Sequence, residues 1–193
     1  MPTKCLEYLP EGVDVWVDSE NGVVGLTGAP KEGEECDPNV VDDGGKASML
    51  RTGGACFDSF RSFGFIRGGH IDCTVLGAYE VDAEGNLANW MIPGQTAAGM
   101  GGAMDLVTGS KITVVMTTQT DKKGNPKIVQ KTEMPLTGYH CIDYIVTEMG
   151  CFHVLPEGLK LFEVAPGVTP EEVQAKTGAK LIFAEPMGCM VKE

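Results

Sequence analysis

The stretch Ile112-Thr113-Val114-Val115-Met116-Thr117-Thr118 has the composition of a β-strand, because β-branched residues dominate it. It is apolar enough to be buried on both faces, as the strands of parallel sheets usually are. Similar runs recur at Val13–Val17, Cys73–Val81, Lys160–Val164 and Lys180–Phe183. Amphipathic stretches alternate with these runs, and this alternation predicts an α/β fold.

The clearest helix signal lies at Thr169–Thr177. Thr169 is a good N-cap, Pro170 suits the first helical position, and Glu172 completes a capping box. Gly178 stands just past the expected end of the helix. Three further helices are predicted, at Asp58–Ile66, Ala103–Val107 and Tyr139–Glu148.

Two connections between these elements carry clear signals. Asp82-Ala83-Glu84-Gly85 is predicted to be the turn of a hairpin between Ala78–Val81 and Leu87–Trp90. The stretch Lys31–Lys46 is rich in Asp, Glu, Gly and Pro, and strand-like patterning resumes on both sides of it. We therefore expect a polar surface loop or lid there, within a single domain that spans residues 1–193.

The composition excludes some classes of partner. The protein has 27 acidic and 15 basic residues, a net charge of −12 and a sequence pI near 4.6. This balance argues against nucleic acid or an anionic membrane as the main partner, and no stretch approaches the roughly 20 apolar residues of a membrane helix. Seven cysteines are scattered without CxxC spacing, so we expect reduced thiols in a cytoplasmic protein.

The first catalytic candidate is Glu20, in the segment Ser19-Glu20-Asn21-Gly22. This segment lies between the strand-like run Val13–Val17 and a glycine-rich turn at Asn21–Gly25. A glutamate before Asn-Gly at a strand end is held in a tight turn, where the chain can present side chains to a cleft. Such a carboxylate can be a general base, a metal ligand or a covalent nucleophile, and this motif alone does not separate the three.

A second candidate is the glycine cluster Gly99-Met100-Gly101-Gly102-Ala103-Met104-Asp105, which runs into an apolar helical stretch. Such a loop can direct backbone N–H groups at a phosphate or an oxyanion. Met104 stands where a dinucleotide motif has its third glycine, and the Gly-Lys-Ser/Thr of a P-loop is missing, so phosphate is the weaker option. The alternative is that these glycines only permit close packing of loop on helix.

The histidines are weaker candidates. His70 and Asp72 are two residues apart in the segment Arg67–Asp72, which suggests a catalytic pair or a metal site. A third ligand is not obvious, so we expect a structural histidine and no metal. His140 and His153 are interpreted as packing or surface residues. A G-x-S-x-G elbow is missing, which disfavours a serine hydrolase.

Several motifs occur in a specific order along nearly the whole chain: Ser19–Gly22, Ile66–Asp72, Gly85–Gly94, Gly99–Val107, Pro135–Gly138 and Leu161–Thr177. Each motif alone is weak, but the ordered set closely resembles the β subunit of the family I CoA-transferases. The likeness is to the 3-oxoacid type, which includes the acetoacetate CoA-transferases. The resemblance implies an open, mostly parallel α/β sheet with flanking helices, the CoA-transferase fold.

The resemblance also implies a mechanism in which Glu20 is the nucleophile. Its carboxylate would attack an acyl-CoA to give a mixed anhydride and CoA thiolate, and the thiolate would then form a glutamyl-CoA thioester. A second acid reverses these steps. The family's oxyanion loop corresponds to Gly99–Ala103, with the N–H groups of Gly101 and Gly102 as donors, while Asn21 and Gly22 shape the turn that exposes Glu20.

Several expectations about substrates and partners follow from the same resemblance. CoA is a substrate and covalent intermediate, with no permanently bound cofactor, and the acids are short-chain ones such as acetoacetate, butyrate or acetate. An α subunit is expected to complete a heterodimer or heterotetramer. The alternatives are an acyl-CoA hydrolase of the same fold, a 3-oxoadipate CoA-transferase subunit, a non-catalytic sugar-phosphate or nucleotide binding module, and a purely structural or regulatory partner.

The chain departs from the family at both ends. Family members usually have a helix, a strand and a Gly-Ile-Gly turn before the residues that match Pro2-Thr3, so we expect this chain to lack that segment. Residues 184–193 run past the usual end and are expected to form a tail.

Overall fold

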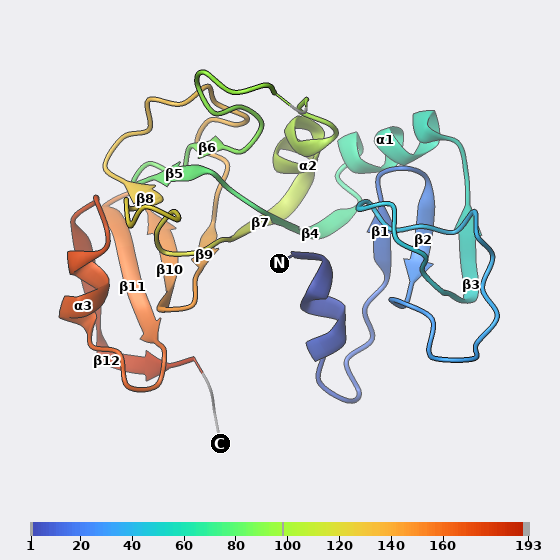
Figure 1. Ribbon diagram of the computed structural model, residues 1–193, viewed down its shortest axis with the longest axis horizontal. Coiled ribbons are helices and arrows are strands. Elements are labelled where there is room, and N and C mark those ends of the chain that lie inside the picture. Colours follow the sequence, from blue (N-terminus) through green and yellow to red (C-terminus); the bar gives the residue numbers. More distant parts are fainter. Residues whose placement is uncertain (1, 98, 191–193) are drawn as a thin grey trace. The chain divides into compact units, whose positions relative to one another are not determined.

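The computed structural model describes residues 2–97 and 99–190. Its internal contacts divide the chain into two compact units, Met1–His70 and Ile71–Glu193 (Figure 1). The first unit contains one sheet and the second contains two. Whether residues 1–193 behave as the single domain expected from the sequence stays a prediction.

The first unit consists of a three-stranded antiparallel sheet with short helices. Its elements are η1 (Pro2–Tyr8), β1 (Val17–Ser19), β2 (Val23–Leu26), β3 (Leu50–Cys56) and α1 (Ser59–Arg67). The strand order is β1-β2-β3, with both neighbouring pairs antiparallel. Asp58 caps α1 by accepting a hydrogen bond from the backbone N–H of Arg61, which confirms the predicted helix within one residue at each end.

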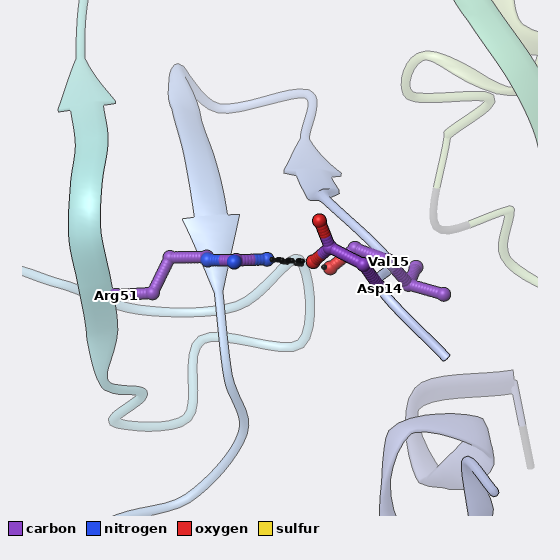
Figure 2. Close-up of polar contacts among 3 residues, drawn as sticks. All are labelled: Asp14, Val15 and Arg51. Carbon is purple, nitrogen blue, oxygen red and sulfur yellow. Dashed lines mark hydrogen bonds and ion pairs between the residues drawn. The ribbon is translucent and has the colours of Figure 1, made fainter. Parts of the chain in front are cut away.

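The strand predicted at Val13–Val17 is wrong for most of its length, because β1 begins only at Val17. Arg51 of β3 holds the preceding segment instead. Its Nη1 donates to Asp14 Oδ1 over 2.6 Å and to the carbonyl of Val15 over 3.3 Å (Figure 2). The guanidinium also lies 4.2 Å from the ring centroid of Trp16. Val15 and Trp16 are exposed, so the apolar pattern here does not contribute to a core.

The second unit is built on a six-stranded mixed sheet with the order β12-β11-β10-β9-β7-β4. Its strands are β4 (Ile71–Leu76), β7 (Ser110–Met116), β9 (Tyr144–Val146), β10 (Gly150–Leu155), β11 (Gly158–Val164) and β12 (Leu181–Cys189). The pairs β4·β7, β7·β9 and β11·β12 are parallel, while β9·β10 and β10·β11 are antiparallel. The sheet is therefore mostly parallel, as the resemblance implied.

A smaller sheet carries the predicted hairpin. It consists of β6 (Leu87–Ala88), β5 (Glu80–Asp82) and β8 (Ile128–Val129), in that order. β5 and β6 are antiparallel, and the buried carboxylate of Asp82 closes their turn by accepting from the backbone N–H groups of Glu84 and Asn86. The hairpin prediction is confirmed.

Two helices pack against the large sheet. α2 (Ala103–Gly109) contacts β4 and β7, and α3 (Pro170–Ala175) contacts β11 (Figure 1). The capping box of α3 is formed as predicted, with Thr169 and Glu172 each accepting from the other's backbone N–H, over 3.2 and 2.8 Å. The core contains fully buried side chains from the central strands and α3: Val115, Ile145, Phe152, Leu159, Leu161 and Val173. Each such side chain stabilises the fold by roughly 1.5–3 kcal/mol.

The helix predicted at Tyr139–Glu148 is wrong, because this stretch is a loop followed by β9. Ile145 is fully buried while its neighbours Tyr144 and Val146 are only half-buried, which is the alternation of a strand. β7 lies on one side of β9 and β10 on the other, so tertiary pairing decides the conformation.

Two other expectations concern loops and ends. The stretch Lys31–Lys46 forms turns and bends outside the strands, as predicted. Residues 184–189, the first part of the expected tail, instead belong to β12, where Gly188 and Cys189 pair with Glu163 and Val164 of β11. Residues 191–193 lie outside the described part of the chain. Within the described residues, no helix is both long and apolar enough to cross a membrane.

Candidate functional site

Glu20 lies in a tight turn between β1 and β2, called here the Glu20 turn (residues 19–22). The backbone N–H of Gly22 donates to the carbonyl of Ser19 over 2.9 Å, which closes the turn. Gly22 has φ 116°, and a Cβ built on it would lie 2.1 Å from the carbonyl oxygen of Phe57. Only glycine fits there. Glu20 itself is half-buried.

A segment distant in sequence contacts this turn. It is called here the Asp43 loop (residues 40–48), and most of it falls within the predicted polar loop. The hydroxyl of Ser19 donates to Asp43 Oδ1, and the backbone of Glu20 also hydrogen-bonds to the Asp43 carboxylate. Asn21 Nδ2 donates to the carbonyl of Val41 over 3.3 Å. Sequence reasoning missed Asp43, because no local motif links it to a serine 24 residues earlier.

The turn is surrounded by negative charge. The pKa of Asp18 is raised to about 6, first by burial and then by the charges of Asp43 and Glu20. Burial also raises the pKa of Asp43, although the bonds from Ser19 and Glu20 act in the opposite direction. Among the described atoms, Oδ1 of Asp18 is buried without a hydrogen-bond partner. Both aspartates are thus less readily ionised than exposed ones.

The predicted oxyanion loop belongs to the second unit, whereas Glu20 belongs to the first. Gly99 and Gly101 have φ of 101° and 57°, so both adopt backbone conformations that favour glycine. Gly102 is the N-cap of α2 and accepts from the N–H of Leu106, and Ala103 begins the helix. The loop therefore leads directly into a helix that packs on β4 and β7.

Two of the ordered motifs meet next to β4. Thr137 Oγ1 donates to Asn89 Oδ1 over 2.6 Å and accepts from the N–H of Asn89 over 3.1 Å. Asn89 Nδ2 then donates to the carbonyl of Gly77, just after β4. Hydrogen bonds therefore join the motifs Gly85–Gly94 and Pro135–Gly138 at the carboxyl end of this strand.

The family of the chain is shown by its similarity to known proteins. Residues 1–176 match the family model described as coenzyme A transferase. The chain belongs to the coenzyme A transferase family. It is 45% identical over 185 residues to the β subunit of the acetate CoA-transferase of Haemophilus influenzae, covering 96% of this chain and 82% of that protein. It is also 44% identical over 185 residues to a subunit of the 3-oxoadipate CoA-transferase of Acinetobacter baylyi, covering 95% and 85%.

The fold of this coenzyme A transferase chain is also found in a solved structure. The acyl-CoA transferase apoenzyme of Escherichia coli O157:H7 superposes with a TM-score of 0.74 at 22% identity. The match covers 98% of this chain and 37% of that one, so the chain spans little more than a third of the E. coli protein. At this identity the likeness concerns the fold alone.

The other titratable candidates in this coenzyme A transferase chain make packing contacts or ion pairs, or have thiols whose pKa is raised. The ring of His70 lies 5.0 Å from that of Phe65, while Asp72 binds Lys111 Nζ over 2.6 Å. Burial raises the pKa of Cys141 and of Cys151 to about 11, so neither thiol suits a nucleophile. Among the described residues, no cluster of three or more His, Cys, Asp or Glu could hold a metal ion.

A pocket of about 430 Å³ in the second unit was not found by sequence reasoning. Its walls include Tyr79, Gln95 and Lys127. Lys127 Nζ donates to the carbonyl of Ala78 over 3.2 Å and to Thr117 Oγ1 over 2.9 Å, and burial lowers its pKa. The ammonium thus joins the carboxyl ends of β4 and β7. A lysine in a short Asn-Pro-Lys-Ile segment gives no local signal of this role.

Proposed function

We propose that the chain is the β subunit of a CoA-transferase that moves CoA between short-chain carboxylic acids, with Glu20 as the nucleophile. The observation that carries this proposal is the Glu20 turn. A half-buried carboxylate is held there between Gly22, which approaches Phe57, and the carboxylate of Asp43, which accepts hydrogen bonds from the Ser19 hydroxyl and the Glu20 backbone. The 45% identity to the β subunit of an acetate CoA-transferase supports the reaction class.

The carboxylate of Glu20 would attack the thioester carbonyl of an acyl-CoA, and the C–S bond would break to release CoA thiolate. The thiolate would then attack the side-chain carbonyl of Glu20 in the resulting anhydride. The first acid leaves as its carboxylate, and Glu20 carries CoA as a thioester. A second carboxylate reverses both steps, so thioester energy is conserved provided that water is excluded.

Each addition places negative charge on a carbonyl oxygen. We assign its stabilisation to the backbone N–H groups of Gly101 and Gly102, within the loop Gly99–Ala103. The positive φ of Gly101 and the position of this loop at the first turn of α2 support that assignment. Preorganised donors of this kind typically lower a barrier by about 3–4 kcal/mol.

The acids and partners follow by analogy with the relatives. Acetate, acetoacetate and butyrate are the proposed acids, with CoA as the only other reactant, and 3-oxoadipate is the alternative that the Acinetobacter relative raises. Because these relatives are named as subunits, an α subunit is proposed to complete a heterodimer or heterotetramer. All seven cysteines are present as thiols, which is compatible with the cytoplasm as a reducing compartment.

Mass spectrometry of the reconstituted α/β complex tests this function directly. The complex is incubated with acetoacetyl-CoA, butyryl-CoA or acetyl-CoA in the absence of an acceptor acid, and then digested. We expect a CoA-sized adduct on the peptide that contains Glu20, lost again when an acceptor acid is added. Release of free CoA with no acceptor and no lasting adduct would instead indicate an acyl-CoA hydrolase.

A further inference from the structure

We propose that Asp43 is a positioning residue for the nucleophile, and that the Asp43 loop holds the Glu20 turn in its reactive conformation. This inference rests on the proposed role of Glu20. It adds a residue from a distant loop to the machinery of the site, and this residue neither reacts nor belongs to the motif that carries the nucleophile.

The Asp43 loop is ordered by its own hydrogen bonds. Asp42 Oδ1 accepts from the N–H groups of Gly44 and Lys46, each over 2.9 Å, and the N–H of Asp42 donates to the carbonyl of Lys46. At its base, the hydroxyl of buried Ser48 donates to the carbonyl of Gly28. The hydrogen bonds inside this turn are therefore made by Asp42, whereas the carboxylate of Asp43 binds a residue outside the turn.

That carboxylate binds two consecutive residues of the Glu20 turn. Ser19, only 1% exposed, donates its hydroxyl to Asp43 Oδ1, and the backbone of Glu20 hydrogen-bonds to the same carboxylate. Hydrogen bonds to an ionised acceptor are roughly twice as strong as neutral ones. Asn21 adds a third contact, to the carbonyl of Val41. The loop thus contacts the residues before and after the nucleophile and the nucleophile's own backbone.

These contacts are not needed to close the turn. The bond from Gly22 to Ser19 closes it, and the bond from Phe57 to Gly22 anchors it. Asp43 brings an additional cost, because it places a second partly buried carboxylate near Asp18, whose pKa it raises. A group that is electrostatically unfavourable yet binds the nucleophile's backbone is better explained by function than by stability.

The test compares Asp43→Ala, Asp43→Asn and the control Asp37→Asn in the reconstituted α/β complex. Asp37 lies before the Asp43 loop in the same connection between β2 and β3, and its carboxylate accepts hydrogen bonds from Asn39. Asp37→Asn therefore removes one negative charge without changing the hydrogen bonds of Asp43 with Ser19 and Glu20. The readout is the single-turnover rate of CoA adduct formation on Glu20 with butyryl-CoA, together with kcat and KM. Thermal unfolding of each complex is measured in parallel.

Asp43→Ala is expected to slow adduct formation by about 10- to 100-fold, because displacements of about 1 Å can have that effect on a reacting group. KM should change by less than about threefold, since no substrate contact is lost. Asp43→Asn keeps an acceptor oxygen and is expected to recover most of the rate, and Asp37→Asn should match the wild type.

Adduct formation by Asp43→Ala at the wild-type rate would overturn the positioning role, and so would equal losses in Asp43→Ala and Asp37→Asn. If Asp43→Ala does not fold, Ser19→Ala takes its place, because it removes the hydroxyl that donates to Asp43 Oδ1. Adduct formation by Ser19→Ala at the wild-type rate, or a loss confined to KM, would contradict positioning. Failure of the proposed function would give a different result, because the wild-type complex would then transfer CoA without any adduct on Glu20. That result would also overturn the positioning role of Asp43.

Discussion

The backbone N–H of Phe57 donates to the carbonyl of Gly22 over 2.8 Å, and in return the carbonyl oxygen of Phe57 occupies the space where a Cβ at residue 22 would lie. This contact joins the Glu20 turn to the residue just before Asp58, the N-cap of α1. Gly22 and Phe57, which are 35 positions apart in the sequence, are thereby fixed against each other through backbone atoms alone. The position of the Glu20 turn therefore depends on the lack of a side chain at residue 22.

Gly22→Ala should strongly destabilise the protein. Its Cβ would lie 2.1 Å from the Phe57 oxygen, in addition to the strain of a φ of 116°. Gly28→Ala is the matched control, because Gly28 also has a positive φ, 100°, but nothing within 4 Å of the built Cβ. Urea unfolding should show Gly22→Ala to be worse than Gly28→Ala by about 2 kcal/mol or more, the cost of the clash. Equal losses of unfolding free energy in the two variants would mean that the turn can move away from Phe57 without cost.

Glu20→Asp should lose most of the transferase activity while the protein remains folded. Shortening the side chain withdraws the carboxylate by about one methylene, and a displacement of roughly 1 Å can cost on the order of 100-fold. Glu20→Gln should abolish adduct formation, because an amide does not form the anhydride. The measurement is steady-state CoA transfer by the α/β complex, with thermal unfolding as the control for folding. Turnover by Glu20→Gln at the wild-type rate would exclude Glu20 as the nucleophile.

Local sequence signals predicted the elements whose structure is decided locally. Thr169, Pro170 and Glu172 specify the start of α3 by capping, and Asp82 specifies the β5–β6 hairpin by binding the backbone of its own turn. The Glu20 turn was also recognisable, because Asn-Gly after a strand-like run favours a tight turn. Each of these features depends on residues fewer than ten positions apart.

Features that depend on distant contacts were missed or misassigned. The stretch Tyr139–Glu148 has a helical apolar spacing, yet pairing with β7 and β10 makes it partly a strand. Val13–Val17 alternates as a strand does, yet Arg51 of β3 binds it through Asp14 and Val15 (Figure 2). Asp43 was hidden for the same reason, since its partner Ser19 lies in a different loop. Such contacts are set by tertiary structure, which single-sequence patterns do not encode.

Gly101 provides a test of the proposed oxyanion loop. Its φ of 57° lies in the left-handed region, which asparagine tolerates and valine does not. Gly101→Asn should therefore preserve the backbone, and we expect adduct formation within about tenfold of the wild type. Gly101→Val should move the N–H donors and slow adduct formation by about 100- to 1,000-fold, the effect of losing such a donor. Similar rates for the two variants, with unchanged stability, would argue that this loop serves packing alone.

Asp18 should make the protein less stable as pH rises from about 4 to about 6. Its pKa in the folded protein is about 6 against 3.8 for an ordinary aspartate, so the folded state binds more protons between these values. The free energy of unfolding then falls as pH increases through this window, and the loss persists above it. Asp18→Asn should therefore stabilise the protein at pH 7.5, by roughly 1 kcal/mol after allowance for partial exposure of the carboxyl group.

Urea unfolding of the wild type and Asp18→Asn at pH 4, 5, 6 and 7.5 measures this effect as a difference that grows with pH. Asp72→Asn is a control of opposite sign, because the hydrogen bond and charge of Lys111 hold the pKa of Asp72 below its usual range. Asp72→Asn should therefore slightly lower the free energy of unfolding at pH 7.5, and this difference from the wild type should disappear on acidification. A constant difference between Asp18→Asn and the wild type across the whole range would show that Asp18 is not protonated near neutral pH. The charge around the Glu20 turn would then be larger than the burial of Asp18 implies.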